Sequence, residues 1–330
     1  MDRENQKENQ KTRSSSRIEL WDRDYELLKT LCSYRLLSTS QIAKLHFPSL
    51  KTAQRRIGQL TNAGLIETRE QLVKRGENKE RLHYLSSAGI MVLGLSSEEQ
   101  KKARANRVKA IKMSDFFLDH FLAVNSFRIS LALACQEKGF TFDWYYENET
   151  KMKDVSGRLK GERVKDPETG YQIIVVPDAY FVLDNPVRKA NYFLEVETND
   201  YASEFYKKAT GYARYRLEGH YQRHWKDERF AVLTIVDEKY ILKYLDYCGK
   251  IKNKELLGMF LFTDMEWIEK YGLFSEIWID GEKQKRGLLP REVEMKTMSQ
   301  VKLEVAKDNA VRVKAKDNVI RPAENRPHQK

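Results

Sequence analysis

The 330-residue sequence predicts a mixed α/β protein with two domains, and three observations support this prediction. The length suits two domains better than one. Hydrophobic residues make up 41% of the chain and aromatic residues 11%, which is enough to build two cores. Helical apolar spacing dominates residues 17–95, whereas strands alternate with helices beyond residue 113.

The order of elements in residues 17–95 is that of a winged helix-turn-helix. The segment LWDRDYELLKTLCSYRLL has apolar residues at helical spacing, and STSQIAKLHF follows as a short, serine-capped helix. A third helix in SLKTAQRRIGQLTNAG has Ala53, Ile57 and Leu60 on one face and Gly64 as its C′ glycine. Two strands, LIETREQLV and ERLHYLS, would form the wing around the polar turn KRGENK.

The third helix of this domain presents side chains that suit DNA. Its polar faces carry lysine, arginine, glutamine and threonine, which bind phosphates and base edges in a major groove. The wing turn adds three basic residues that would make a second contact with the DNA backbone. The candidate DNA-binding residues are Lys51, Thr52, Gln54, Arg55, Arg56, Gln59, Lys74, Arg75 and Lys79. A solvated helix face, or a winged helix used for protein contacts, is the alternative interpretation.

The net charge of +11 is concentrated at the two ends of the chain. Residues 1–112 hold 23 Lys and Arg against 13 Asp and Glu, and residues 296–330 hold 9 against 4. Residues 113–295 hold 27 against 31 and are slightly acidic. Basic segments of this kind favour contact with a polyanion such as nucleic acid, although they also serve solubility.

The domain boundaries follow from composition and from the order of elements. Beyond residue 113 the order is a long helix, three strands, a helix, a central strand, a further helix in EKYILKYLDYCGKIK and a last strand in MFLFTDM. The two ends of the chain are polar and short of aromatic side chains, which predicts disorder. The predicted organisation is residues 1–16 disordered, 17–95 winged helix-turn-helix, 96–112 linker or exposed helix, 113–295 mixed-sheet domain, and 296–330 a basic, largely disordered tail.

Three carboxylates stand in two neighbouring strands of the second domain. In VVPDAYFVLD and ANYFLEVET, Asp178 lies in one strand and shares a face with Tyr180 and Val182, and Glu195 and Glu197 share one face of the next because side chains alternate. If the strands pair, the carboxylates converge, and unpaired buried carboxylates are costly. A hard divalent cation, Mg²⁺ or Mn²⁺, would remove that cost. Taken singly, Pro-Asp is an ordinary turn dipeptide, and Glu-x-Glu suits the wet face of a strand.

The segments VVPDAYFVL, YFLEVETND, YKKATGYARY and RFAVLTIV resemble the replication-relaxation family of plasmid and mobile-element proteins, over most of residues 17–245. The chain is similar, more distantly, to winged-helix relaxases of the MOB-C type. The resemblance implies a winged helix before a domain of the PD-(D/E)xK restriction-endonuclease fold. It also implies that Asp178 and Glu195 are the metal-binding acids of that motif. Glu197 stands where this fold usually has its lysine, which is a departure from the pattern.

The helix that follows offers two lysines that could supply the positive charge of the missing lysine. Lys207 and Lys208 begin this helix, and either could replace the lysine, while a solvated helix face is the alternative. Glu197 would then complete the metal shell or orient water. Tyr212 and Tyr215 follow near the same stripe, as packing residues or as a covalent nucleophile.

Histidines provide further candidates. In the resembled families the long opening helix borders the active site, so His120 is a catalytic candidate, although a core or capping histidine shows the same pattern. His220 and His224 are spaced as a zinc pair on a helix, but no H-E-x-x-H accompanies them. The segment around this pair also looks like a basic helix end.

Several classes of protein are excluded because their motifs are missing. The sequence has no Walker A motif, no G-x-G-x-x-G and no G-x-S-x-G, which argues against an ATPase, a dehydrogenase and an α/β-hydrolase. No apolar run approaches the roughly 18 residues of a membrane span, and the first residues lack the apolar core of a signal peptide. Cys32, Cys135 and Cys248 are far apart, which fits a reducing cytoplasm.

The leading hypothesis is a plasmid-type DNA-binding protein that nicks or relaxes DNA at a replication or transfer origin. It would use Mg²⁺ or Mn²⁺ and act with replication or mobilisation proteins, without a membrane partner. The second hypothesis is a non-enzymatic replication or transcription factor that keeps the nuclease fold as a scaffold, which the missing lysine favours. A protein–protein adaptor that recruits replication proteins is the third. Metal-dependent cleavage separates the first hypothesis from the others, since a scaffold shows only salt-sensitive DNA binding.

Overall fold

The computed structural model describes residues 18–70, 80–146, 152–153, 159–160, 162–165, 170, 172–186, 188–198, 200–225 and 229–289. The chain is a mixed α/β protein, which confirms the fold class that the sequence predicts. It divides into two compact units, residues 1–133 and 134–330. The division falls within helix α6 (Asp115–Lys138), later in the chain than the change in composition at residue 113.

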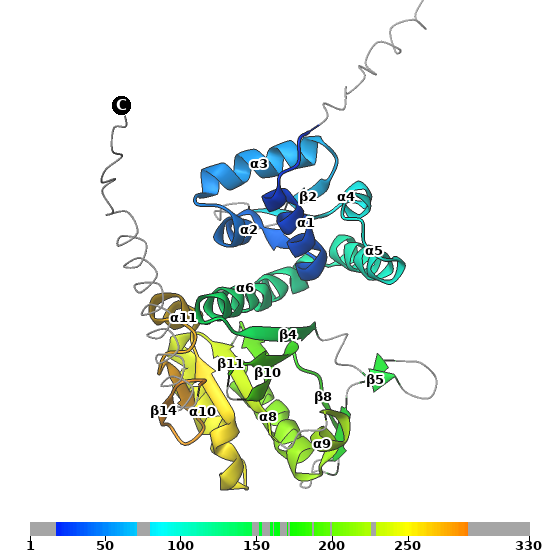
Figure 1. The fold of residues 1–330 in the computed structure, drawn as a ribbon. Helices are drawn as coiled ribbons and strands as arrows, with labels where there is room; N and C mark the ends of the chain where they lie inside the picture. The colour runs from blue at the N-terminus through cyan, green and yellow to red at the C-terminus, as the bar shows by residue number, and fades with distance from the viewer. Residues whose placement is uncertain are drawn as a thin grey trace, which may run out of the picture. The chain divides into compact units, whose positions relative to one another are not determined.

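In the described residues, the first unit combines helices with a three-stranded sheet (Figure 1). Its elements before α6 are α1 (Asp22–Tyr34), β1 (Leu37–Ser38), α2 (Thr39–His46), α3 (Leu50–Asn62), β2 (Ile66–Glu70), β3 (Arg81–Leu85), α4 (Ser87–Val92) and α5 (Ser97–Lys112). Strand β3 lies between β1 and β2 and is antiparallel to both. The three helices and the pair β2–β3 follow the predicted order, and β1 adds a third strand.

Caps and apolar spacing explain where these helices begin and what they bury. The Ser38 side chain caps α2 by accepting the Gln41 N–H. Gly64 follows α3 with a φ of 76°, and Leu65 N donates to Leu60 O at 3.0 Å, which closes the helix as a Schellman motif does. The buried faces are the predicted ones, and the core includes Leu28, Leu31, Ala53, Ile57 and Leu60.

The segment between the two predicted domains forms helix α5, which packs on α1. The helix buries small and polar side chains, Ala103, Asn106 and Ala110. Asn106 Oδ1 accepts a hydrogen bond from Arg35 Nε at 3.2 Å, and its amide donates to Cys32 O at 3.1 Å. Because these contacts need no large apolar residue, composition alone does not distinguish such a helix from a linker.

Two helical glycines of the first unit differ in the space around them. A Cβ added at Gly89 in α4 would lie 2.3 Å from Leu65 O, whereas a Cβ added at Gly58 in α3 meets nothing within 4 Å. We expect Gly89→Ala to lower the free energy of unfolding by about 1–3 kcal/mol through overpacking. We expect Gly58→Ala to raise it by about 1 kcal/mol through helix propensity. Urea denaturation followed by circular dichroism measures both changes, and equal effects at the two positions would contradict this packing.

In its described residues, the second unit is built on a seven-stranded mixed sheet of order β14-β13-β12-β11-β10-β9-β4. Strands β10, β11 and β12 run parallel to one another, and the other neighbours are antiparallel. The strands are β4 (Thr141–Tyr146), β9 (Ala179–Asp184), β10 (Lys189–Glu197), β11 (Ala231–Val236), β12 (Phe260–Thr263), β13 (Trp278–Asp280) and β14 (Lys285–Arg286). The sequence prediction ended at β12, so it missed β13 and β14.

Short strands between β4 and β9 pair outside the main sheet. They are β5 (Met152–Lys153) with β6 (Leu159–Lys160), and β7 (Glu162–Lys165) with β8 (Gln172–Val175). The β7–β8 pair packs against helix α8. A Cβ added at Gly211 of α8 would lie 2.9 Å from an Ile173 methyl, so the glycine allows this close approach.

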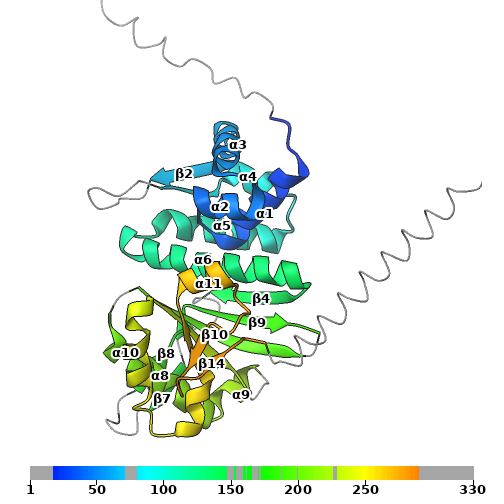
Figure 2. The same cartoon turned by 90° about the vertical axis from the view of Figure 1, so that its left-hand side faces the viewer.

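Helices α8 and α10 lie side by side and cover one face of the sheet (Figures 1 and 2). The helical segments of this unit are α8 (Ala202–Leu217), α9 (His220–Trp225), α10 (Glu238–Cys248), the 3₁₀ helix η1 (Lys254–Met259) and α11 (Met265–Tyr271). The sequence predicted one helix where α8 and α9 stand, but Gly219 has a φ of 66° and separates them. The core under α8 and α10 includes Phe193, Phe205, Tyr212, Val232, Tyr244 and Phe262.

Helix α6 is, among the described residues, long and apolar enough by composition to cross a membrane. Its buried polar side chains bind the protein instead. Asn125 donates to Leu36 O at 2.8 Å, and Arg128 donates to Ser33 O at 3.1 Å. The Arg128 guanidinium also lies 3.9 Å from the centre of the Tyr34 ring. These contacts hold α6 against the end of α1 and the residues that follow it.

Candidate functional site

Strand pairing fixes Asp178 at the end of the sheet beside Glu195. Strands β9 and β10 are antiparallel neighbours, as expected, and Asp178 N donates to Leu194 O at 3.1 Å. Pro177, which precedes Asp178, has no N–H to continue the ladder. The Asp178 carboxylate accepts the Val196 N–H at 2.8 Å, so its position depends on the backbone of β10.

A lysine from α8 joins the two glutamates of β10. Lys208 Nζ lies 2.8 Å from Glu195 Oε2 and 2.7 Å from Glu197 Oε1. Both carboxylates therefore face α8, in agreement with strand alternation. Lys207, one position earlier, is exposed on the outer side of the helix. Of the two lysines that the sequence suggests as replacements for the missing lysine, Lys208 is the one that contacts the carboxylates.

Glu195 is buried and receives hydrogen bonds at both carboxylate oxygens. Its side chain is 1% exposed, and Oε1 accepts the hydroxyl of Tyr212, one helical turn after Lys208. Tyr215 packs instead against the rings of Phe193 and Phe230, at centroid distances of 6.2 and 6.1 Å. Tyr212 is thus the member of the tyrosine pair that belongs to the site.

Burial and neighbouring charges shift the pKa values of this cluster. Burial raises the pKa of Glu195 to about 7, a shift that Lys208 opposes and Asp178 increases. Burial lowers the pKa of Lys208, but the carboxylates of Glu195, Glu197 and Asp178 outweigh it and raise the pKa overall. Burial and Glu195 raise the pKa of Tyr212. At neutral pH the site therefore holds a charged lysine, a neutral tyrosine and a glutamate close to its pKa.

The raised pKa of Glu195 makes the stability of the second unit depend on pH. The folded state keeps a proton that the unfolded chain releases at lower pH. The resulting stabilisation is present below the usual glutamate pKa and is lost as the pH rises through about 7. We expect the wild-type protein to lose unfolding free energy over this range relative to Glu195→Gln. Chemical denaturation from about pH 5 to pH 8 measures the difference. The exposed Glu204→Gln is the control. If the free energy of unfolding of the wild type and of Glu195→Gln changes with pH in parallel, the prediction is contradicted.

Thr234 is a site residue that the sequence reasoning missed. It lies beside Glu195 in the parallel register of β10 and β11 and is fully buried. Within the described part of the chain its Oγ1 has no hydrogen-bond partner, although buried hydroxyls normally have one. The sequence feature that could have identified Thr234 is its position as a polar residue within AVLTIV, the otherwise apolar run of a central strand. The orphaned hydroxyl fits a site that receives one more polar ligand.

Asp178 and Glu195 provide the kind of donor set that Mg²⁺ or Mn²⁺ takes from proteins. Mg²⁺ is usually held by one or two carboxylates together with substrate phosphates and water. Among the residues that the structure describes, no group of three or more His, Cys, Asp and Glu side chains is arranged to hold a metal ion. Glu197 is paired with Lys208. Asp178 and Glu195 would therefore supply only two carboxylates, and the other ligands of such an ion would have to be water or phosphate oxygens.

The candidate histidines have other surroundings. His120 is half-buried on the part of α6 that belongs to the first unit. His220 lies 3.1 Å from Glu218 Oε2 and stacks on the ring of Tyr215 at 6.0 Å. The side chain of His224 lies outside the described residues. A two-histidine zinc site at α9 is therefore not supported.

The predicted DNA-binding residues of α3 are mainly on its exposed face. Thr52 is partly exposed, and the exposed residues are Lys51, Gln54, Arg55 and Gln59. The three basic residues of the wing turn, Lys74, Arg75 and Lys79, lie outside the described residues.

Arg56 needs a correction, because it is buried. Its Nε donates to Asp24 Oδ1 at 2.9 Å, and a further guanidinium nitrogen donates to Glu19 O at 2.7 Å. Position 56 is one helical turn from Ala53 and Leu60, so it falls on the stripe that faces the core. Arg56 therefore does not belong to the exposed face of α3 that the sequence predicts to bind DNA.

The chain therefore combines a basic helical unit with a mixed sheet, and the acidic residues at the end of β10 pair with a lysine of α8. The family model for replication-relaxation proteins matches residues 28–228, more than half of the chain. The chain therefore belongs to the replication-relaxation family, which indicates a role related to plasmid replication or relaxation. The matched region contains α3 and the cluster of Asp178, Glu195, Glu197, Lys208 and Tyr212, and it ends before Thr234. No curated protein and no solved structure matches the chain.

Proposed function

We propose that this protein binds DNA through α3 and nicks one strand at a plasmid origin, with Mg²⁺ or Mn²⁺ held by Asp178 and Glu195. The observation that carries the proposal is the position of Lys208, whose ammonium group lies between the two glutamates of β10. Lys208 would supply the positive charge of the lysine that this fold usually has at the position of Glu197.

The order of elements supports this proposal in both units. Helix α6 and strands β4, β9 and β10 are followed by α8 and by β11, which is parallel to β10. This is the order expected of a PD-(D/E)xK core. In the first unit, α1, α2 and α3 followed by the β2–β3 pair support a winged helix-turn-helix.

Each side chain of the site has a role that its surroundings support. Bound Mg²⁺ or Mn²⁺ would supply neutralisation of phosphate charge and an activated water. Lys208 would stabilise the negative charge that develops on the scissile phosphate. Glu197, held in place by Lys208, would orient the attacking water or take its proton. The Tyr212 hydroxyl would hold Glu195 in position for the metal.

Loss of basic residues from α3 is expected to weaken DNA binding. The paired change Lys51→Ala with Arg55→Ala removes two exposed charges, and we expect about tenfold weaker binding of duplex DNA with a shallower salt dependence. Fluorescence anisotropy at several salt concentrations measures both quantities. Lys101→Ala with Arg104→Ala removes the same charge from α5 in the same unit. If this control weakens binding equally, α3 is not the DNA-binding face.

Cleavage is tested with a supercoiled plasmid that carries the cognate origin. Incubation with the protein and Mg²⁺ or Mn²⁺ is expected to give open-circle product. The product should disappear when a chelator removes the metal. A substrate that stays supercoiled under all these conditions would contradict cleavage.

A non-catalytic replication or transcription factor is the second candidate function. The ion pairs of Lys208 with both glutamates favour it, because they compensate the buried charge without a metal. Calorimetry with Mn²⁺ in the presence of DNA separates the two candidates, since the factor is expected to bind no metal at millimolar concentration. In either case the proposed partners are DNA and replication or mobilisation proteins, and the proposed location is the cytoplasm.

A further inference from the structure

Two cavities of about 730 Å³ and 420 Å³ lie where β10, β11 and β12 begin. Both belong to the size range of small-molecule sites. They share lining residues and so form one hollow, here termed the arginine pocket. The shared residues are Arg188, Tyr192, Ala231, Gly258 and Arg286.

The arginine pocket is separate from the carboxylate site. Lys189 lines the pocket at the start of β10, and Glu195 lies six residues further along the same strand. At about 3.3 Å per residue, the two positions are about 20 Å apart. The same sheet therefore offers acidic groups at one end and basic groups at the other.

Basic side chains outnumber acidic ones around the pocket. The charged lining residues are Arg188, Lys189, Arg216, Arg229, Lys285 and Arg286 against Glu255, Glu276 and Glu282. This excess stands out because residues 113–295 hold more Asp and Glu, 31, than Lys and Arg, 27. Guanidinium groups bind phosphate through paired hydrogen bonds. The charge of the lining therefore favours an anionic ligand.

Arg216 and Arg286 form a fixed part of the pocket wall. Arg286 is ion-paired with the buried Asp280, and its Nη2 lies 3.9 Å from Glu282 Oε2. Arg216 is half-buried and donates to Met259 Sδ at 3.8 Å. A thioether is a weak, uncharged acceptor, and within the described part of the chain no ion pair compensates the positive charge of Arg216. This charge faces the same hollow as the exposed Arg188 and Arg229.

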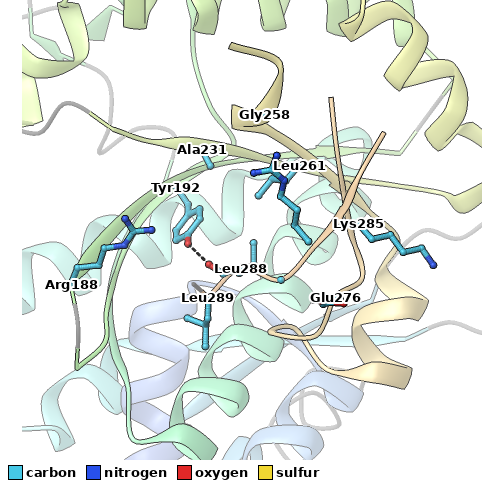
Figure 3. Close-up of a pocket in the computed structure, with 11 residues that line it drawn as sticks. Arg188, Tyr192, Ala231, Gly258, Leu261, Glu276, Lys285, Leu288 and Leu289 are labelled. Carbon is cyan, nitrogen blue, oxygen red and sulfur yellow. Dashed lines mark hydrogen bonds between the residues drawn. The ribbon is translucent and has the colours of Figure 1, made fainter. Parts of the chain in front are cut away.

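A glycine and a hydrogen bond line the middle of the pocket. A Cβ added at Gly258 would lie 3.8 Å from Arg286 Nη2, an ordinary van der Waals contact, so the backbone of η1 lies next to the guanidinium. The buried Tyr192 donates its hydroxyl to Leu288 O at 3.1 Å, which holds the segment after β14 against β10. Figure 3 shows Arg188 and Lys285 on opposite sides of this hydrogen bond.

We propose that the arginine pocket binds phosphate groups of a nucleotide or a nucleic acid strand. Free nucleotides and the DNA backbone offer the same phosphate chemistry, and the experiment separates these two sources. The site is distinct from the metal-binding carboxylates and does not require that they cleave DNA.

The test uses the full-length protein and the paired change Arg188→Ala with Arg229→Ala. Both side chains are exposed, so their removal leaves the core intact. The probes are ATP without divalent metal, followed by calorimetry, and a fluorescein-labelled single-stranded oligonucleotide, followed by anisotropy. The oligonucleotide is also measured in the Lys51→Ala and Arg55→Ala background, so that α3 does not mask the pocket. Lys138→Ala with Lys270→Ala, exposed and outside the lining, is the charge-matched control.

We expect the pocket variant to bind at least one probe about tenfold more weakly than the control variant. A loss confined to ATP identifies a nucleotide site, and a loss confined to the oligonucleotide identifies a DNA contact. The proposal is overturned if the wild-type protein binds neither probe, or if the pocket and control variants bind equally. If circular dichroism shows that the double variant is unfolded, the single exposed change Arg188→Glu decides by the same criteria. Nicking of plasmid DNA is scored separately, so failure here leaves the cleavage proposal standing.

Discussion

Lys208→Ala is expected to lower the rate of plasmid nicking by about 100-fold or more, the effect of losing a donor that stabilises developing charge. The Nζ atom of Lys208 lies 2.7 and 2.8 Å from the carboxylates of Glu197 and Glu195. About 40% of its side chain is exposed, so the lysine is in part accessible from solvent. Its pKa is raised despite burial, which keeps the charge in place across the working pH range.

The neighbouring residue provides the control for this prediction. Lys207→Ala removes the same charge from the exposed side of α8 and is expected to leave the rate unchanged. Single-turnover formation of open circles gives both rates, and circular dichroism confirms that the variants are folded. Glu195 can take up a proton when Lys208 is absent, so the variant need not unfold. Equal rates for the two variants, or full activity of Lys208→Ala, would show that Lys208 does not replace the missing lysine.

Arg56→Met is expected to cost the first unit about 3–5 kcal/mol of unfolding free energy, the usual result of removing one partner of a buried ion pair. Asp24 is 0% exposed, and its carboxylate would be left without the guanidinium. Burial raises the pKa of Asp24, but Arg56, the Trp21 N–H and Arg23 together outweigh it, and the pKa of Asp24 is lowered. The guanidinium also lies 4.5 Å from the centre of the Trp21 ring, a contact that would be lost as well.

Two further variants show whether this loss comes from the ion pair. Arg55→Met, on the exposed side of α3, is expected to change stability by no more than about 0.5 kcal/mol. Asp24→Leu combined with Arg56→Met should recover much of the loss, because it removes both buried charges. Urea denaturation measures all three variants. If Arg56→Met is as stable as the wild type and binds DNA poorly, Arg56 belongs on the DNA surface after all.

Short-range sequence patterns were sufficient to predict the helices of the first unit and the proximity of Asp178 to Glu195. Ser38 and Gly64 mark helix ends through hydrogen bonds to residues nearby in sequence, which propensities capture. Asp178 and Glu195 meet because β9 and β10 are joined by a short loop and pair as neighbours. In both cases the interacting residues are separated by fewer than about twenty positions, and sequence patterns are informative over such short ranges.

Contacts between distant residues could not be predicted in the same way. Arg56 looked like a surface residue because its partner, Asp24, is 32 positions away. Lys208 could not be chosen over Lys207, because the phase of α8 against the sheet depends on how Phe205, Tyr212 and the β7–β8 pair pack. The arginine pocket combines residues from loops before β10 and β11, from α8 and from β14, so no single sequence motif marks it.

The claim that Asp178 and Glu195 form a metal-dependent nicking site is tested most directly by Asp178→Asn. Asparagine keeps an oxygen that can accept the Val196 N–H, so the end of β10 should stay in place while the metal-binding charge is lost. With Mn²⁺ and a supercoiled plasmid carrying the cognate origin, the wild-type protein should produce open circles. Asp178→Asn should bind the same DNA with unchanged affinity and produce open circles at least about 100-fold more slowly. Metal-dependent nicking at the wild-type rate by Asp178→Asn would contradict the assignment of this site.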